Sequence, residues 1–232
     1  MVRAAALALL LLAAPADAGC RLALALGFDV SKSVSNRDYE IQQGGIIAAL
    51  RDPAVRDAFL QPSEPVALAI FEWSGRSYQD VVLAWTMIGD EAALNQVVAL
   101  VQSRLRDPKP RPTALGHALL YAETLLDQAP DCASYTLDIS GDGRNNDGLS
   151  PRDAYARTDY STVTVNGLAI GGIETDILPY YSAELMHGPG AFVLSARRRE
   201  DFPDAIRRKL LRELTAALLG QGFPTPQPDP AG

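Results

Sequence analysis

Histidine and cysteine are scarce in this sequence, which has two residues of each in 232. Neither His117 nor His187 has cysteine or glutamate at the spacing of zinc ligands, so we interpret both as structural or surface residues. The spacing of the acidic residues does not match an EF-hand calcium loop either. A zinc site of the common cysteine–histidine kind and an EF-hand are therefore excluded.

The sequence also lacks the short motifs of several common enzyme classes. It contains no Gly-x-Gly-x-x-Gly loop, no phosphate-cradling Gly-Lys-Ser and no Gly-x-Ser-x-Gly elbow. An excess of positive charge is missing as well, because the formal net charge is −7. We therefore expect no nucleic-acid partner and no binding to acidic membrane surfaces.

Cationic residues nevertheless cluster in two places, at 197–199 and at 207–209. Apolar residues in the same region repeat at the spacing of a helix. We interpret these cations as the solvated face of a helix near the end of the chain.

Long hydrophobic runs are confined to the beginning of the chain. Arg3 precedes the apolar run 4–14, and Ala16-Asp17-Ala18 places small residues at both positions that a signal peptidase reads. The run is short for a membrane span, so a signal peptide is favoured over a membrane anchor or a buried helix. We predict a signal peptide over 1–18, cleaved after Ala18, and a periplasmic or secreted protein with no integral membrane segment after cleavage.

Cys20 raises the alternative of a lipoprotein, because Ala18 and Gly19 are the small residues that a lipid-modification site needs before its cysteine. Asp17 stands where such a site has leucine, which favours a protein without a lipid anchor. Cleavage would remove one arginine and one aspartate, so the net charge of the mature chain would stay the same.

The pattern of apolar residues predicts an α/β fold. Runs of strand length alternate with segments of helical period, which indicates a doubly wound, mainly parallel six-stranded sheet with helices on both faces and one short antiparallel edge strand. The strands are expected over 22–28, 66–71, 81–85, 135–139, 163–170 and 191–195. The helices are expected over 36–50, 91–105, 115–126, 151–156, 178–186 and 202–219. We assign 19–219 to one domain and the proline-rich 220–232 to a disordered tail.

Oxygen-bearing side chains gather where the first expected strand ends. The run Asp29-Val-Ser31-Lys-Ser33 places a carboxylate and two hydroxyls at alternating positions of one loop. In a parallel sheet, ligands bind beyond the carboxyl ends of the strands, and hard divalent cations prefer such oxygen ligands. Alone this loop is ambiguous, because serine and aspartate also cap helices.

Two further residues resolve the ambiguity: Thr113 opens an expected helix, and Asp142 follows the fourth expected strand and precedes a glycine. With Asp29, Ser31 and Ser33 they resemble the metal-ion-dependent adhesion site of von Willebrand factor A domains. The resemblance covers about residues 20–219. More narrowly, 72–74 and 140–146 resemble a family of exported bacterial proteins with this fold that is described only as a domain of unknown function.

The resemblance implies a binding module rather than an enzyme. Ser31 and Ser33 would bind a divalent cation directly, and Asp29, Thr113 and Asp142 would bind it directly or through water. We expect Mg²⁺, with Mn²⁺ and Ca²⁺ as alternatives, and a vacant coordination position for an acidic group of a protein or other partner. Lys32 replaces the glycine that many relatives have there and would attract or obstruct that ligand. We expect a monomer.

The same resemblance makes the first and fourth strands neighbours. Cys20 lies nine residues before Asp29 and Cys132 lies ten before Asp142 (29 − 20 and 142 − 132), so the two sulfurs would meet at the end opposite the metal. In an oxidising compartment this predicts a Cys20–Cys132 disulfide rather than two free thiols.

Several polar residues near the expected site have two interpretations. Asp138 would make structural hydrogen bonds or support the metal loop, and Trp73 would pack against a neighbouring loop or contact a ligand. Residues 145–147 would form a polar turn that caps the following helix or add oxygen ligands, and Glu174 and Asp176 would form a turn or tune the site.

Two other functions compete with a metal-dependent binding module. A phosphatase of the aspartyl-nucleophile type also begins with an apolar strand ending in aspartate, but it needs a second aspartate where this chain has Ser31. Alternatively, the metal site is not functional and the fold serves only as an interaction scaffold.

Overall fold

A computed structural model of the protein describes residues 19–107, 109–172, 174 and 176–220. The predicted signal peptide and the tail from residue 221 onward lie outside the described residues. The last helix continues to Gly220, one residue beyond the expected domain boundary.

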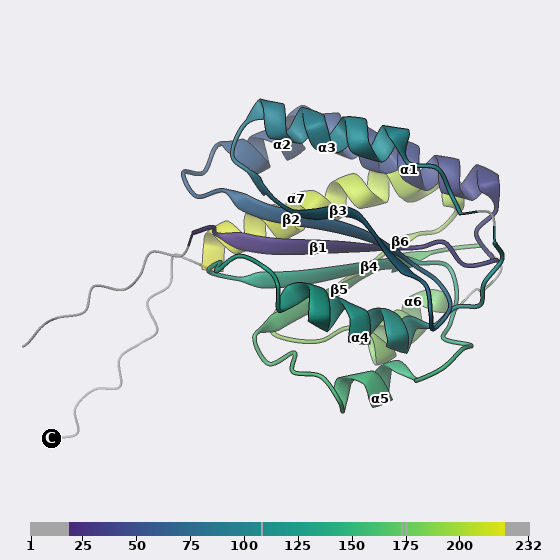
Figure 1. The fold of residues 1–232 in the computed structure, drawn as a ribbon. Helices are drawn as coiled ribbons and strands as arrows, with labels where there is room; N and C mark the ends of the chain where they lie inside the picture. Colours follow the sequence, from purple (N-terminus) through teal and green to yellow (C-terminus); the bar gives the residue numbers. More distant parts are fainter. Residues whose placement is uncertain (1–18, 108, 173, 175, 221–232) are drawn as a thin grey trace, which may run out of the picture.

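One six-stranded sheet forms the centre of the molecule, in the order β3-β2-β1-β4-β5-β6 (Figure 1). Its strands are β1 (Leu22–Asp29), β2 (Val66–Trp73), β3 (Gln79–Ile88), β4 (Tyr135–Gly141), β5 (Val163–Ile170) and β6 (Val193–Ala196). All neighbours pair in parallel except β2 and β3. The predicted α/β class and the adjacency of the first and fourth strands are confirmed.

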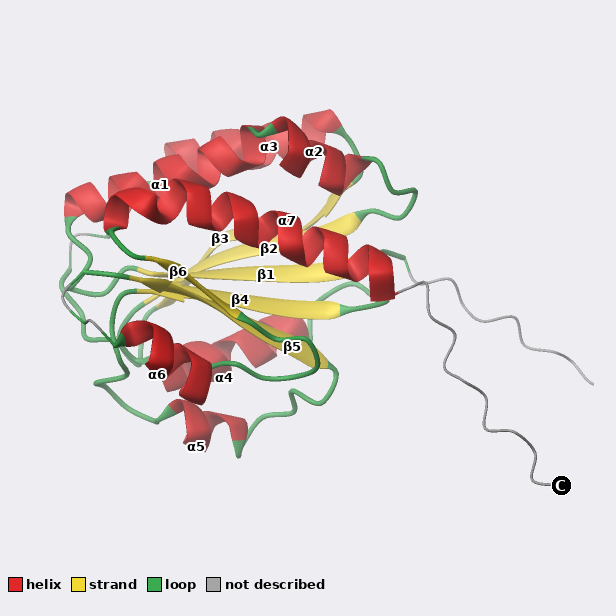
Figure 2. Ribbon diagram, turned by 180° about the vertical axis from the view of Figure 1, so that it is seen from behind, coloured by secondary structure: helices red, strands yellow, loops and turns green. Residues whose placement is uncertain are grey.

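Helices cover both faces of this sheet (Figures 1 and 2). On one face lie α1 (Asn36–Arg51), α2 (Pro53–Leu60), α3 (Glu91–Ser103) and α7 (Phe202–Gly220). On the other lie α4 (Leu115–Leu126), α5 (Pro151–Tyr155) and α6 (Ile177–Glu184). Every residue of β1 and β2 is buried, as expected for central strands covered on both faces.

The antiparallel edge strand is confirmed but is longer than expected. The apolar run predicted only 81–85, whereas β3 spans Gln79–Ile88 and pairs along the whole of β2, from Val66 with Ile88 to Trp73 with Gln79. Register irregularities near Leu68 and Ile70 disturb the pattern of side chains in the middle of the strand. The run of consecutive apolar residues covers only the middle of this strand, because Gln79, Asp80 and Thr86 are polar.

Helix α2 was not predicted, although its start signal is present in the sequence. Asp52 accepts hydrogen bonds from the backbone of Ala54 and Val55, and Pro53 occupies the first turn. The helix is short and follows α1 with only Asp52 between them, and no element was predicted from the sequence between residues 50 and 66. Other boundaries differ by one or two residues: α3 ends at Ser103, α6 ends at Glu184 and β6 begins at Val193.

The predicted disulfide between Cys20 and Cys132 is confirmed, with a Cα–Cα distance of 4.5 Å. Both cysteines are buried and lie at the amino ends of β1 and β4. Within the described part of the chain, no helix has both the length and the apolar character needed to cross a membrane.

Candidate metal centre

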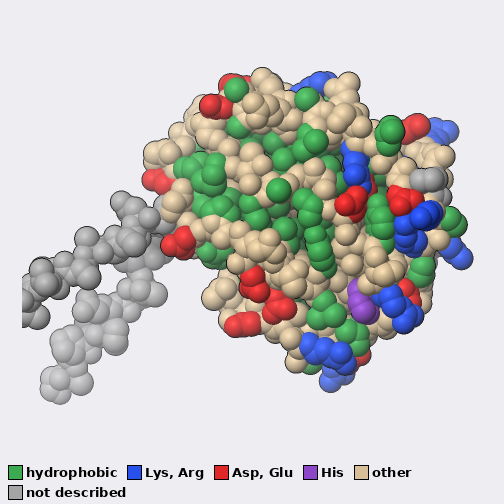
Figure 3. Space-filling view, in the orientation of Figure 1, with side chains coloured by type: hydrophobic (Ala, Val, Ile, Leu, Met, Phe, Trp, Pro, Cys, Tyr) green, Lys and Arg blue, Asp and Glu red, His purple; other side chains and the backbone are tan. Residues whose placement is uncertain are grey.

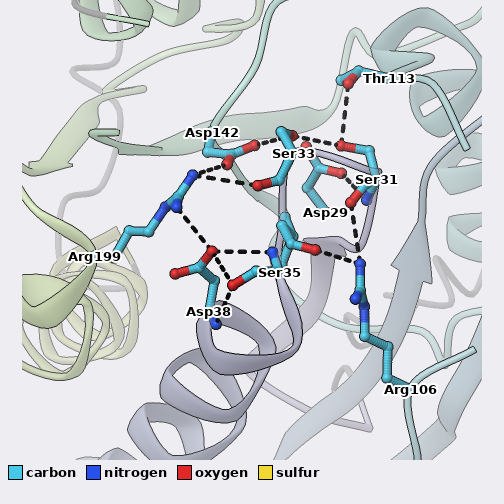
Figure 4. A network of polar contacts seen from close by, with 10 residues as sticks. Asp29, Ser31, Ser33, Ser35, Asp38, Arg106, Thr113, Asp142 and Arg199 are labelled. Atoms are coloured by element: carbon cyan, nitrogen blue, oxygen red, sulfur yellow. Dashed lines mark hydrogen bonds and ion pairs between the residues drawn. The ribbon is translucent and has the colours of Figure 1, made fainter. Parts of the chain in front are cut away.

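The five predicted ligands come together where β1 and β4 end (Figure 4). Phe28 pairs with Ser140, so Asp29 and Gly141 are the next residues along two neighbouring parallel strands. The loop after β1 carries Ser31 and Ser33, and the turn after β4 carries Asp142. Thr113 reaches the same point from the segment that precedes α4. The predicted convergence of these side chains is therefore observed.

A chain of short hydrogen bonds connects the five residues. Ser33 Oγ donates to Asp142 Oδ1 at 2.6 Å, and the Oγ atoms of Ser31 and Ser33 are 3.0 Å apart. Thr113 Oγ1 donates to Ser31 Oγ at 3.1 Å. The backbone N–H of Ser31 donates to Asp29 Oδ1 at 2.7 Å. This hydrogen bond holds the loop after β1 against the Asp29 carboxylate.

One carboxylate oxygen of this cluster is buried without a partner. Asp29 is fully buried, and its Oδ2 has no hydrogen-bond partner among the described residues. Burial raises the pKa of the Asp29 carboxyl, and the neighbouring charge of Asp142 raises it further. Hydroxyl and carboxylate oxygens around an unpartnered buried carboxylate oxygen fit a hard divalent cation, which would offset this cost.

Two glycines, the last residue of β4 and one that follows it, keep the space around the carboxylates open. A Cβ atom at Gly141 would lie 3.2 Å from Asp29 Oδ2 and 2.2 Å from Tyr181 Oη, and one at Gly143 would lie 3.4 Å from Thr113 Oγ1. The hollow beside the cluster is lined by Lys32, Ser33, Pro112, Thr113, Asp142, Gly143, Asn146 and Glu174. Lys32 is exposed at its rim.

The residues that follow Asp142 hold the Thr113 segment in place. The backbone N–H of Thr113 donates to Asn146 Oδ1 at 2.9 Å, and the N–H of Asn146 donates back to the Thr113 carbonyl at 2.8 Å. Asn145 Oδ1 accepts from the N–H of Gly116 at 3.2 Å in the first turn of α4. The turn thus caps α4, which comes before it in the chain, rather than the helix that follows.

Arg199 is a member of the site that the sequence interpretation missed. Its guanidinium lies 3.1 Å from Asp142 Oδ2 and 2.8 Å from Asp38 Oδ2, and it donates to the Ser33 carbonyl at 3.3 Å (Figure 4). A Cβ atom at Gly172 would lie only 3.0 Å from this guanidinium, so the glycine leaves room for it. The interpretation of 197–199 as a solvated helix face is therefore wrong for Arg199. Nothing local distinguishes it from Arg197 and Arg198.

Other polar and aromatic residues of this region make their contacts outside the five-residue cluster. Trp73 is fully buried and packs in the hydrophobic core, whereas it was expected from the sequence to pack against a neighbouring loop or to contact a ligand. Glu72 is also buried and accepts from Tyr39 Oη at 2.6 Å and from Arg104 at 3.0 Å. Glu174 lines the hollow and accepts from the backbone N–H of Arg144 at 3.2 Å. Asp176 pairs with the Arg144 side chain.

Charged side chains of both signs are interspersed at the surface where the parallel strands end, at the right of Figure 3. Several are paired, including Arg76 with Asp147, and Arg144 with Asp176. Lys32 forms no ion pair with any described residue. It therefore presents a positive charge beside the hollow.

Comparison with known proteins identified one matching family. The family described as "Protein of unknown function (DUF1194)" matches residues 19–218. No curated protein matches the sequence.

Solved structures with the same fold are numerous. Proximal thread matrix protein 1 from the mussel byssus, in a structure described as having a zinc occupied MIDAS motif, aligns at a TM-score of 0.60 and 14% identity over 85% of this chain and 48% of its own. A von Willebrand factor type A protein from Catenulispora acidiphila aligns at 0.62 and 16% identity, over 84% and 43% of the two chains. A mutant of the PilB minor pilin from Streptococcus sanguinis aligns at 0.64 and 12% identity, over 91% and 65%.

The present chain therefore spans about half the length of the first two proteins. At these identities the likeness shows a shared fold.

Proposed function

This chain belongs to the DUF1194 family and has the von Willebrand factor A fold, and on this basis we propose that it is an exported binding module that uses a divalent cation to hold an acidic group of a partner. The cysteine bridge and the pattern of the first eighteen residues support export. The zinc-occupied motif of the byssus protein supports a cation at the corresponding place.

The observation that carries the proposal is the donor set at the ends of β1 and β4. Asp29, Ser31, Ser33, Thr113 and Asp142 would hold the cation. When bound, the cation would act as a Lewis acid that is coordinated by a carboxylate oxygen of the partner. Mg²⁺ is the expected ion, with Mn²⁺ or Ca²⁺ as alternatives, because all donors are oxygens.

This chain's own residues then perform distinct tasks. Ser31 and Ser33 present hydroxyls on one tight loop, and the hydrogen bond from Ser33 to Asp142 Oδ1 keeps that carboxylate turned toward the cluster. Asn146 holds the backbone of Thr113 through two hydrogen bonds, one to its N–H and one to its carbonyl. The exposed Lys32 attracts an approaching acidic partner. None of these tasks requires a nucleophile or a proton transfer, so we propose binding rather than catalysis.

Calorimetric titration with Mg²⁺ and Mn²⁺ tests the proposal. The mature wild-type protein is expected to bind one ion saturably, and an Asp29→Ala/Asp142→Ala variant is expected to lose this binding, because both carboxylates are removed. A matched control is Asp127→Ala/Asp131→Ala, which removes two exposed carboxylates at the opposite end of the sheet and should bind like wild type.

Circular dichroism must first show that both variants are folded. An absence of binding to wild type, both alone and with an added carboxylate such as a glutamate-rich peptide, would contradict the proposal. The scaffold interpretation would then replace it. Equal binding by wild type and the Asp29→Ala/Asp142→Ala variant would place the cation elsewhere.

Arg199→Gln is expected to increase Mg²⁺ affinity about threefold to tenfold. The guanidinium shares the Asp142 carboxylate with the proposed cation, and like charges at this short range repel even at an intermediate dielectric. The measurement is the same titration at low and high salt, where the difference should shrink as salt rises.

Arg198→Gln is the matched control for this prediction. Arg198 is the neighbouring arginine, is mostly exposed and pairs only with Asp201 in the described structure, so its loss should leave the affinity unchanged. A weaker affinity of the Arg199→Gln variant would mean instead that Arg199 orients Asp142 for the cation.

A further inference from the structure

A fully buried cluster of charged side chains lies between the sheet and α7, away from the candidate metal centre. Lys209 and Glu213 come from successive turns of α7, Asp138 comes from the middle of β4, and Asn166 comes from the adjacent β5. Figure 2 shows α7 crossing this part of the sheet. The sequence interpretation had placed Lys209 on a solvated helix face, which is wrong because its side chain is 0% exposed.

The amine of this cluster contacts both carboxylates. Lys209 Nζ lies 2.8 Å from Asp138 Oδ1 and 2.6 Å from Glu213 Oε1. Asn166 Nδ2 donates to the same Glu213 oxygen at 2.8 Å, and Asn166 Oδ1 accepts from the backbone of Phe192. Asn166 therefore fixes Glu213 against the amine.

Charge within the cluster is not balanced. Two carboxylates face one amine, and the exposed fraction of the Asp138 and Glu213 side chains is 1% each. Asp138 Oδ2 and Glu213 Oε2 have no hydrogen-bond partner among the described residues. Burial raises the pKa of the Asp138 carboxyl, Lys209 opposes this rise, and the charge of Glu213 adds to it. The environment thus favours an uncharged form of Asp138.

We propose that Lys209 and Asp138 condense after folding into an intramolecular amide bond, with Glu213 as the group that moves the proton. Three features of the cluster support this modification. The amine and the carboxyl group are already in contact, a carboxylate base touches the amine, and the site excludes the water that would reverse the reaction.

The reaction balances without any further reactant. Lys209 gives one ammonium proton to the Asp138 carboxylate, and the resulting neutral amine attacks Asp138 Cγ to form the carbon–nitrogen bond. Glu213 accepts a second proton from the nitrogen and passes it to the hydroxyl of the former carboxyl group, so that the carbon–oxygen bond breaks and one water molecule leaves. The third proton stays on the amide nitrogen. The products are a neutral amide and the Glu213 carboxylate, with the total charge unchanged and nothing oxidised or reduced.

Burial favours the amide over the ion pair. Two opposite charges held out of water carry a large desolvation penalty, which their mutual attraction only partly offsets. A buried neutral amide carries a smaller penalty, and its N–H would stay beside the Glu213 oxygen that Lys209 Nζ contacts and to which Asn166 Nδ2 donates. The bond would tie α7 to the centre of the sheet, across 71 residues of sequence (209 − 138).

Intact-mass measurement of the reduced and denatured mature protein tests the proposal. The expected mass is that of the reduced sequence minus one water molecule. Lys209→Arg keeps a cation and Glu213→Gln keeps an acceptor for Asn166, and each variant is expected to show its full sequence mass. If the Lys209→Arg variant does not fold, the Glu213→Gln variant still tests the proposal.

The position of the water loss must be established as well, because an Asp-Gly pair such as Asp142-Gly143 can lose water by cyclising. After reduction and proteolysis, the expected product is one branched peptide that joins the segment of Asp138 to that of Lys209. A full sequence mass in the folded wild type, or a water loss located outside this branched peptide, would overturn the proposal and leave an ion cluster.

Discussion

Replacing both cysteines of the Cys20–Cys132 disulfide by alanine is expected to lower the free energy of unfolding by up to about 4–5 kcal/mol. The bridge closes a loop across a sequence separation of 112 residues, and closing a long loop removes much conformational entropy from the unfolded chain. Alanine is the suitable replacement because both positions are buried beside Ala23 and Ala67, where a serine hydroxyl would add a desolvation penalty. The measurement is urea unfolding of the oxidised wild type and of the variant.

Wild type treated with a reductant is the matched control, and its free energy of unfolding should fall by a similar amount. The variant should still bind Mg²⁺ like wild type, because the bridge lies at the opposite end of the sheet from Asp29 and Asp142. A loss smaller than about 1 kcal/mol would mean that the unfolded chain is already restricted in some other way.

Lys209→Met is expected to destabilise the protein by about 3–5 kcal/mol, because the variant has neither the amide nor the ammonium group and leaves the carboxylates of Asp138 and Glu213 buried without a cation. Methionine retains most of the volume of the lysine stem, so a packing defect should contribute little. Urea unfolding at pH 7 measures the loss. Lys32→Met, at an exposed position, is the control and should change stability by less than about 0.5 kcal/mol.

A triple variant separates the charge contribution from the covalent one. Lys209→Met/Asp138→Leu/Glu213→Gln removes the uncompensated charges and keeps an acceptor for Asn166, so it is expected to recover most of the loss. The remaining loss in the free energy of unfolding measures the contribution of the proposed covalent link between α7 and β4. A triple variant no more stable than Lys209→Met would contradict the assignment of the loss to unpaired charge.

The residues whose roles depend on local sequence were predicted well. Asp29, Ser31 and Ser33 follow a strand that is apolar throughout, so both the strand and the position of its polar end could be read from the chain. Thr113 and Asp142 required the family pattern, because no local signal connects them with a loop that lies eighty or more residues earlier in the chain. The structure brings all five together, and whether they bind a cation remains a proposal.

Arg199 and Lys209 show what the sequence did not determine. Both lie in cation-rich segments, and three neighbouring arginines look alike in the sequence although only Arg199 reaches Asp142. The period of apolar residues in a helix shows which residues share a face, but it does not show which other segment that face packs against. Only the docking of α7 across β4 and β5 places Lys209 against Asp138.

The sequence by itself determined the class of fold, the extent of the domain's central strands and the loop that carries three of the five candidate ligands. These features follow from the spacing of apolar residues and from the residue types that favour turns, which act over a few residues. The tertiary structure alone decided the length of the antiparallel edge, the partners of Arg199 and the buried cluster around Lys209. Those depend on contacts between segments far apart in the chain, which local chemistry does not encode.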